Sequence, residues 1–455
     1  MCVKSAMHVA TCASRSLQGF LVLALLIGVL PPSALAQGAA AAKAEIASFA
    51  LSALSALSLA DAERLMLERN RELQAARRAR EAARADSMVA AQGVNPVLTL
   101  QTFNINPRLG IGAGGPRDKT VDTTVRIDQI IERGEKRELR VAAAGRLEAA
   151  SDADFLAARR QQQLVLRIAY YELALAQEKT LVLADTAGLF GKSLEAAERR
   201  LNAGDIARAD LARLRVDALR AGNDARAAEA DLARSQLALA YIVGLEGDAA
   251  TLRATDAWPQ ADAAAPVATA ATAELIDRRP DVRAAQARVE ALERSRELAR
   301  RLRTRDVSVG AQFEHWPQSA GNQQGSGNSV GFAVSVPLFV RHAYGGEIRR
   351  AEVEYDAARD ALARIRAQAA GEFARAASDL HAASDRVRRY QGGLLEEARR
   401  SAEAAEYAYR NGALGIMDLL DARRTLRATQ IDSAQARADH AKALAAWNAS
   451  ATPTE

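Results

Sequence analysis

Apolar residues recur at helical spacing over most of the chain. Between Ile348 and Leu394 they follow one another at alternating steps of three and four, with one additional step of four. This pattern predicts a coiled-coil seam with a single stutter, where the supercoil locally unwinds. Helices are expected over 58–92, 135–200, 207–245, 281–303, 347–410 and 416–447. The helix 135–200 would be about 100 Å long at 1.5 Å per residue. Helices of that length must pack along one another, as in a tube of hairpins.

Shorter segments show a period of two instead. Strands are expected over 96–105, 121–131, 306–315 and 329–340. In the second of them, Val125 and Ile127 face one side while Thr124 and Arg126 face the other. Strands of about ten residues with one apolar and one polar face suit a tilted transmembrane barrel. A soluble, half-buried sheet is the alternative, but four strands among so much helix would make a poor one.

The same order of elements occurs twice, which indicates an internal duplication. Gly204 is followed by Asp210 and Leu211, and Gly412 is followed at the same spacing by Asp418 and Leu419, at an offset of 208 residues. We therefore expect a first repeat over 37–246, a linker over 247–273, a second repeat over 274–448 and a C-terminal tail over 449–455. Asn and Gly at both breaks suit helix ends, because they tolerate left-handed backbone angles.

The first 36 residues have the features of a signal peptide. Lys4 and Arg15 precede an apolar run over 17–30, and Ala34-Leu35-Ala36 is a small-x-small cleavage site. An N-terminal membrane anchor is the alternative. Both cysteines of the chain, Cys2 and Cys12, lie within this segment, so the mature chain should carry neither a disulfide nor a lipid anchor. No later stretch is long and apolar enough for a transmembrane helix, so a membrane crossing would require a barrel.

The distribution of charge argues against a nucleic-acid-binding protein. Removing the two basic residues of the signal peptide lowers the formal net charge from +5 to +3, and basic and acidic residues alternate along the helices. Such alternation is typical of a solvated helical face, so we expect no nucleic-acid partner.

Motifs for chemistry are equally weak. Gly110, Gly112 and Gly115 match a dinucleotide-binding pattern, but a strand follows them where the pattern requires a helix, which indicates a hairpin loop. The mature chain's histidines, His315, His342, His381 and His440, are not spaced as metal ligands. We expect no metal site, no cofactor and no catalytic site, and the protein should not be an enzyme.

Three segments, 278–292, 334–358 and 409–426, resemble the TolC-type outer membrane factors. The stretch 132–140 and the Asn-Pro-Val-Leu at 95–98 are most similar to the cobalt–zinc–cadmium efflux branch. This resemblance implies a mostly α protein that forms a homotrimer. Each protomer would donate four strands to one twelve-stranded barrel and its helices to a long periplasmic coiled-coil tube.

The resemblance also implies a function. The chain would be the outer-membrane channel subunit of a tripartite efflux system in a Gram-negative bacterium. As a passive exit duct it would connect through a periplasmic adaptor to an inner-membrane pump of the RND type and carry heavy-metal cations. Its barrel would contact outer-membrane lipid. The alternatives are an exit duct for drug efflux or type I protein secretion and, in another class, a periplasmic adaptor or coiled-coil scaffold. An adaptor has a single hairpin, whereas this chain has two.

Two carboxylates are candidates for a pore constriction. Asp418 and Asp421 share one face of a helix about two turns after Gly412. In a threefold channel each would form a ring of three, and acidic rings select cations. The alternative is that Asp418 is only a helix-start carboxylate and that Asp421 only pairs with Arg423 or Arg424.

The resemblance assigns further positions around that constriction. It implies that Asp418 and Asp421 line it, and that Asp210 and Tyr409 belong to a network that holds it shut. Leu414 stands where a basic partner would be expected, so this network must differ here. The hairpin tips, where the adaptor would dock, are Gly204, Asp205, Gly412 and Ala413.

Overall fold

The computed structural model describes residues 56–103, 105, 121–261, 273–316 and 327–451. The predicted signal peptide, the glycine-containing loop after residue 105, part of the linker and most of the C-terminal tail lie outside the described residues. The elements from Leu57 onward belong to one unit. Most of its residues are helical, as predicted. The helices are α2 (Leu59–Arg69), α3 (Arg71–Ala91), α4 (Lys136–Asn202), α5 (Arg208–Val243), η2 (Glu246–Thr251), α6 (Ala273–Asp277), α7 (Pro280–Arg301), α8 (Gly345–Arg389), η3 (Tyr390–Leu394), α9 (Leu395–Arg410) and α10 (Ile416–Ala451).

Two predicted helices are interrupted. The single helix expected over 58–92 is wrong, because Asn70 separates α2 from α3. Its side chain caps α3 by accepting from the Leu73 N–H at 3.1 Å, and its amide donates to the Ile242 carbonyl at 3.0 Å. The helix expected over 347–410 contains a π-helical turn, η3, in which Gly393 has a φ of +133°. An L side chain rarely adopts that angle, and the Gly392-Gly393 pair supplies it here.

The last helix is longer than predicted. α10 continues to Ala451 rather than ending at 447, so it enters the expected tail. The predicted breaks at 202–205 and 411–415 agree with the ends of α4 and α9 and with the start of α10.

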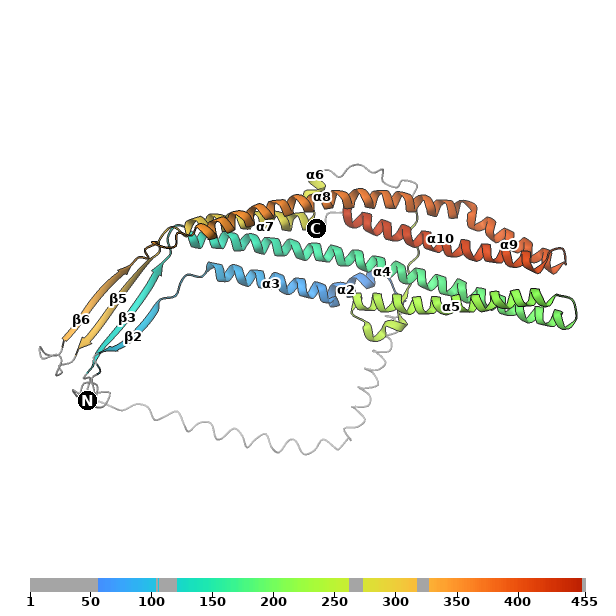
Figure 1. The fold of residues 1–455 in the computed structure, drawn as a ribbon, viewed down its shortest axis with the longest axis horizontal. Coiled ribbons are helices and arrows are strands. Elements are labelled where there is room, and N and C mark those ends of the chain that lie inside the picture. The colour runs from blue at the N-terminus through green and yellow to red at the C-terminus, as the bar shows by residue number, and fades with distance from the viewer. Residues whose placement is uncertain (1–55, 104, 106–120, 262–272, 317–326, 452–455) are drawn as a thin grey trace, which may run out of the picture. The chain divides into compact units, whose positions relative to one another are not determined.

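The four long strands form one antiparallel sheet in the order β2-β3-β5-β6 (Figure 1). They are β2 (Val97–Phe103), β3 (Asp122–Ile131), β5 (Val307–Trp316) and β6 (Gly327–Ser335). β6 therefore ends five residues before the predicted boundary at 340. Each strand joins the helices at the same end of the sheet, and the hairpin ends lie at the opposite end of the helices (Figure 1).

The register of the sheet separates an apolar face from a polar one. Leu100 pairs with Val125, Val125 with Phe313 and Phe313 with Val330, which places all four on one face. The next layer on this face contains Leu98, Ile127, Ala311 and Phe332. The opposite face carries polar side chains. There Arg126 forms two hydrogen bonds with Asp128, at 2.7 and 2.8 Å. The predicted alternation is thus confirmed.

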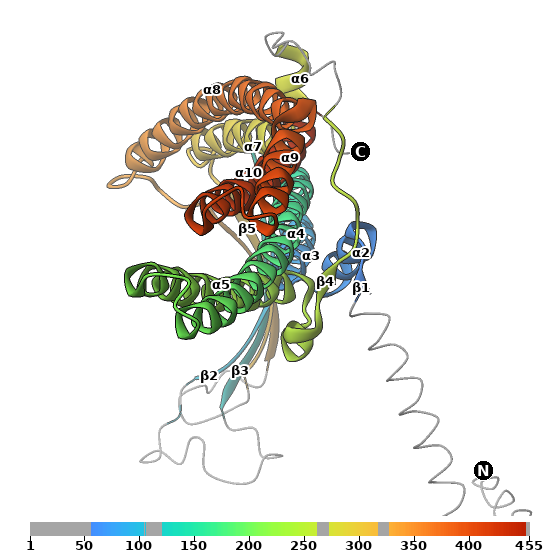
Figure 2. The ribbon, with the colours of Figure 1, turned by 90° about the vertical axis from the view of Figure 1, so that its right-hand side faces the viewer.

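The helices pack around α4, the longest of them. α3, α5, α7 and α10 all contact it, and small side chains such as Ala150 and Ala153 are buried along it. α2 lies on one side of α4 and α10 on the other (Figure 2). Within the described ranges, no helix combines the length and the apolar character that crossing a membrane requires.

Part of the expected linker is well structured. After η2, the short strand β4 (Arg253–Ala254) pairs with β1 (Ala56–Leu57). The buried Tyr170 hydroxyl of α4 donates to the Leu57 carbonyl at 3.0 Å and accepts from the backbone N–H groups of Thr255 and Asp256. Trp258 stacks on Tyr171 and donates to Glu178. These contacts hold the first part of the expected linker against α4.

A buried ionic cluster fixes the start of α7, where Pro280 occupies the first turn as predicted. The Arg279 side chain is only 6% exposed and bonds to Asp281 at 2.8 Å and to Glu372 of α8 at 2.7 Å. Arg160 of α4 also pairs with Asp281. Burial alone would raise the pKa of Asp281, but the Arg279 hydrogen bond and the two guanidinium charges outweigh it and hold the pKa below its usual value. Burial and the charge of Arg279 lower the pKa of Arg160.

Candidate functional site

Both hairpins end in the same backbone arrangement. Gly204 and Gly412 have φ angles of +85° and +71°. The next N–H, of Asp205 and of Ala413, donates to the carbonyl five residues earlier, at 2.9 and 2.8 Å. This is the Schellman pattern, in which a left-handed glycine satisfies the last carbonyls of a helix. All four residues are exposed, so the tips are accessible to a partner.

The two candidate constriction residues lie in the first turns of α10, and both are exposed. Asp421 accepts from Arg424 at 2.7 Å, as the alternative interpretation expected. Arg424 also reaches Asp217 of α5, whose side chain is only 12% exposed. Arg424 thus connects Asp421 to the neighbouring hairpin, while the Asp421 side chain remains 68% exposed.

The two residues expected in the closing network have different partners within the chain. Tyr409 accepts from Arg200 of α4 at 3.0 Å, whereas Asp210 lies 4.0 Å from Arg213 of its own helix. Within the part of the chain that the structure describes, Asp210 and Tyr409 share no hydrogen bond. Leu414 lies half-buried in the turn before α10. The side chain that meets Tyr409 therefore comes from α4, not from position 414.

Sequence reasoning missed most of the polar contacts between the hairpins. Arg423 of α10 donates to Ser193 of α4 at 3.2 Å. One turn further along α10, Arg427 pairs with Asp224 of α5 at 2.9 Å. Leu420 of α10 is buried together with Phe190 of α4 and Leu214 of α5 in a core that the two hairpins share. Spacing on one helix gives no signal for these contacts, because their partners are about 200 residues away.

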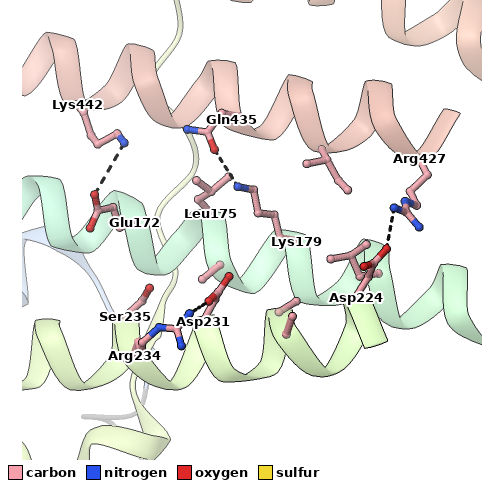
Figure 3. Close-up of a pocket in the computed structure, with 15 residues that line it drawn as sticks. Glu172, Leu175, Lys179, Asp224, Asp231, Arg234, Ser235, Arg427, Gln435 and Lys442 are labelled. Carbon is pink, nitrogen blue, oxygen red and sulfur yellow. Dashed lines mark hydrogen bonds and ion pairs between the residues drawn. The ribbon is translucent and has the colours of Figure 1, made fainter. Parts of the chain in front are cut away.

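Side chains of α4, α5 and α10 line a cavity of about 610 Å³, and Arg427 and Asp224 are part of its lining (Figure 3). Its charged side chains mostly contact one another or neighbouring polar groups. Lys179 donates to Gln435 at 2.8 Å, and Lys442 lies 3.9 Å from Glu172. With both signs of charge so closely mixed, the cavity presents no field of a single sign. No group of three or more His, Asp, Glu or Cys within the described ranges is placed to hold a metal ion.

Solved structures share this fold. The outer-membrane channel OprN superimposes with a TM-score of 0.71 over 86% of this chain and 89% of that one, at 24% sequence identity. Among curated proteins, the cobalt-zinc-cadmium resistance protein CzcC of Cupriavidus metallidurans is 26% identical over 332 residues, covering 70% of this chain and 75% of that protein. The pyoverdine export outer membrane protein OpmQ of Pseudomonas putida is 28% identical over 193 residues, 39% of this chain and 37% of that protein.

A family model accounts for most of the sequence. The model for outer membrane efflux proteins matches residues 64–245 and 272–450. These two segments include both strand pairs and both helical hairpins. The chain therefore belongs to the outer membrane efflux protein family.

Proposed function

We propose that this protein is the outer-membrane channel subunit of a tripartite efflux system. In this proposal the signal peptide is removed, and the chain trimerises in the outer membrane of a Gram-negative bacterium without a lipid anchor. The helices form a tube in the periplasm. A periplasmic adaptor docks on the hairpin tips and connects the duct to an inner-membrane pump of the RND type. The duct is passive, so its function requires no catalytic group.

The two-faced sheet is the observation that carries this proposal. Its apolar face is open: Leu100 is 69% exposed, Val330 67% and Phe332 84%. β2 and β6 are the edges of the sheet. Exposed edges and exposed apolar faces are both unfavourable in water. Three such sheets joined edge to edge would satisfy every edge in one twelve-stranded barrel, with the apolar face toward lipid and the polar face toward the pore.

The length of the helices supports the rest of the duct. α4 has 67 residues, which corresponds to about 100 Å. It starts beside the sheet and ends at the Gly204 tip, far from the proposed membrane (Figure 1). The tips would therefore be the part of the chain best placed to meet an adaptor anchored on the inner membrane.

We propose heavy-metal cations as the cargo. The similarity to CzcC, a cobalt-zinc-cadmium resistance protein by name, supports this choice. The exposed Asp418 and Asp421 agree with it, because three copies would place acidic rings at the narrow end. The shorter match to OpmQ, a pyoverdine export outer membrane protein by name, favours export of pyoverdine as a second candidate.

Disulfide cross-linking across the two edges tests the barrel, because every native cysteine lies in the first 36 residues. Cysteines would replace Thr99 or Gln101 of β2 together with Ser329 or Gly331 of β6. At least one pair should give cross-linked trimers in outer-membrane fractions. In the control pair, Thr124 of β3 lies opposite Glu314 of β5 in the same chain. Cysteines at these two positions should therefore form a disulfide within one chain and no cross-linked trimer. If no edge pair links separate copies, the barrel is wrong.

Cargo is tested separately, in a strain that lacks the gene. Loss of the protein should increase sensitivity to cobalt, zinc and cadmium, and the wild-type chain should restore resistance. Unchanged metal tolerance together with reduced export of pyoverdine would favour the second candidate.

A further inference from the structure

The segment between β6 and α8, residues 336–344, exposes large apolar side chains, and we name it the junction segment. Val336 is 41% exposed, Leu338 71% and Val340 84%. They continue the alternate positions of Val334 and Phe332, which are 71% and 84% exposed on the apolar face of β6. The apolar stripe of the edge strand thus runs on after its last pairing with β5, at Ser335.

The junction segment has a defined conformation. The Phe339 and Tyr344 rings meet edge to face, with centroids 5.2 Å apart, and the Arg305 guanidinium lies 5.6 Å from the centre of the Phe339 ring. Arg303 donates to the Ala343 carbonyl at 3.2 Å. These contacts engage Phe339, which is half-buried, while the residues on either side of it remain exposed. Leu338 and Val340 are therefore presented to the outside by a fixed turn.

The length of the apolar stripe can be compared with the height of the apolar band of a membrane barrel. From Val330 to Val334 the stripe covers four steps, about 13 Å at 3.3 Å per residue, or about 10 Å after a 40° tilt. The apolar band of an outer-membrane barrel is about 25 Å tall. Extending the stripe to Val340 gives ten steps and at most about 25 Å along the membrane normal. The apolar stripe within the paired part of β6 is too short by itself, and the apolar side chains of the junction segment extend it.

A cation follows the apolar residues directly. Arg341 is exposed and has no acidic partner among the described residues, whereas the neighbouring His342 lies 2.8 Å from Glu347. A guanidinium binds phosphate through two parallel hydrogen bonds. Two apolar side chains followed by an arginine suit the boundary between acyl chains and headgroups. The apolar side chains would contact acyl chains, and the guanidinium would contact phosphate.

We propose that the junction segment is a lipid anchor in the periplasmic leaflet of the outer membrane, an inference that rests on the proposed function. Leu338 and Val340 insert among acyl chains, and Arg341 binds a phospholipid phosphate. Continuity with the apolar stripe of β6 and the unpaired cation both favour lipid over a second copy of the chain as the occupant.

Fluorescence quenching tests this in the full-length mature chain. A single cysteine at Leu338 carries a bimane label, and the protein is reconstituted in vesicles of phosphatidylethanolamine and phosphatidylglycerol. Lipids with a spin label on the acyl chain should quench it, and aqueous iodide should not. Phe332→Cys, on the sheet, serves as the lipid-facing control and Glu403→Cys, on α9, as the aqueous control.

Each outcome is decisive. Quenching by iodide at 338 overturns the anchor, and so does quenching by neither agent, since a partner copy then covers the site. If the label at position 332 is protected from iodide but the label at position 338 is not, the lipid-anchor proposal is wrong and the barrel proposal is retained. If both positions are quenched by iodide, the proposed function itself fails.

The arginine is tested through bound lipid. Arg341→Gln should lower the amount of phosphatidylglycerol that co-purifies with the trimer, measured by native mass spectrometry. Arg349→Gln, an exposed arginine on α8, should not. Equal retention by wild type and R341Q would remove Arg341 from the anchor.

Discussion

At the residue scale, two glycines determine how the hairpins end. A φ of +85° at Gly204 and of +71° at Gly412 is accessible to glycine but strained for a β-branched residue. We predict that Gly204→Val and Gly412→Val each impair metal efflux while trimers still reach the outer membrane. Resistance assays and immunoblots of membrane fractions measure both effects. Gly222→Ala, a helical glycine with open space around it, is the control. If both valine variants pump normally, the tips are not the docking site.

The paired aspartates make a second prediction at this scale. If Asp418 and Asp421 line the constriction, the Asp418→Ala, Asp421→Ala double variant should lose cation selectivity and block by multivalent cations, because uncharged rings no longer attract them. Single-channel recording in planar bilayers measures both properties. Asp205→Ala removes an exposed acid at the neighbouring tip and should leave selectivity unchanged. Wild-type selectivity in the double variant would leave Asp421 with only its structural pairing to Arg424.

Asp281 should make stability depend on pH. Its pKa is lowered in the folded chain by Arg279 and Arg160, against the effect of burial. A lowered pKa contributes stability that is present above the unfolded value, about 3.9, and is lost as the pH falls through the folded value. We therefore predict that the thermal midpoint decreases below about pH 4 and that Asp281→Asn weakens this dependence while lowering the midpoint at pH 7. Circular dichroism measures both. Asp277→Asn, which removes an exposed pairing with Arg366, should reproduce neither effect.

At the element scale, the break between α2 and α3 depends on one buried side chain. Asn70 is 4% exposed and bonds to both Leu73 and Ile242. Asn70→Ala removes a helix cap and leaves the Ile242 carbonyl without this donor. We expect a loss of about 1–2 kcal/mol and a lower thermal midpoint. Arg78→Ala, an exposed change on α3, is the control. An unchanged midpoint for Asn70→Ala would mean that the break is set by packing alone.

Periodicity predicted most elements because long helices and alternating strands repeat one signal many times. It failed where a single residue decides. Asn70 interrupts a run of good helix formers, and no change of apolar spacing marks it. η3 had a signal, the Gly392-Gly393 pair, since glycine pairs occur at kinks. That signal was hidden because the seam residues Tyr390 and Leu394 keep a helical step across it.

The candidate site was predictable only where its signal is local. The Schellman ends follow from Asn and Gly, and the pairing of Asp421 with Arg424 follows from their three-residue spacing. The second contact of Arg424, with Asp217, joins two helices that only the folded chain brings together. The same holds for Tyr409, whose partner Arg200 no local pattern identifies. Cross-hairpin contacts of this kind exist only where the two hairpins pack together, as Leu420 does with Phe190 and Leu214.

At the scale of the whole molecule, the chain leaves surfaces that one copy cannot cover. The apolar sheet face and the strand edges are exposed together, at the end of the helices farthest from the hairpin tips (Figure 1). Burying apolar area stabilises an assembly by about 25 cal/mol per Å². An unpaired strand edge adds a further cost in lipid, where no water can satisfy it. Both terms favour several copies joined by their sheets in a membrane-like solvent.

We therefore predict that the purified mature protein is a trimer that requires detergent and has a mostly helical spectrum with a minor strand share. Sedimentation in matched detergent measures the mass of the protein part. Phe332→Asp places a charge at the most exposed apolar position of β6 and should reduce recovery from the outer membrane, because charges on a lipid face are destabilising. Glu403→Gln, which changes a charge on α9, should not. A monodisperse monomer that stays in solution without detergent would contradict the barrel, the trimer and the duct together, since all three depend on the same uncovered sheet.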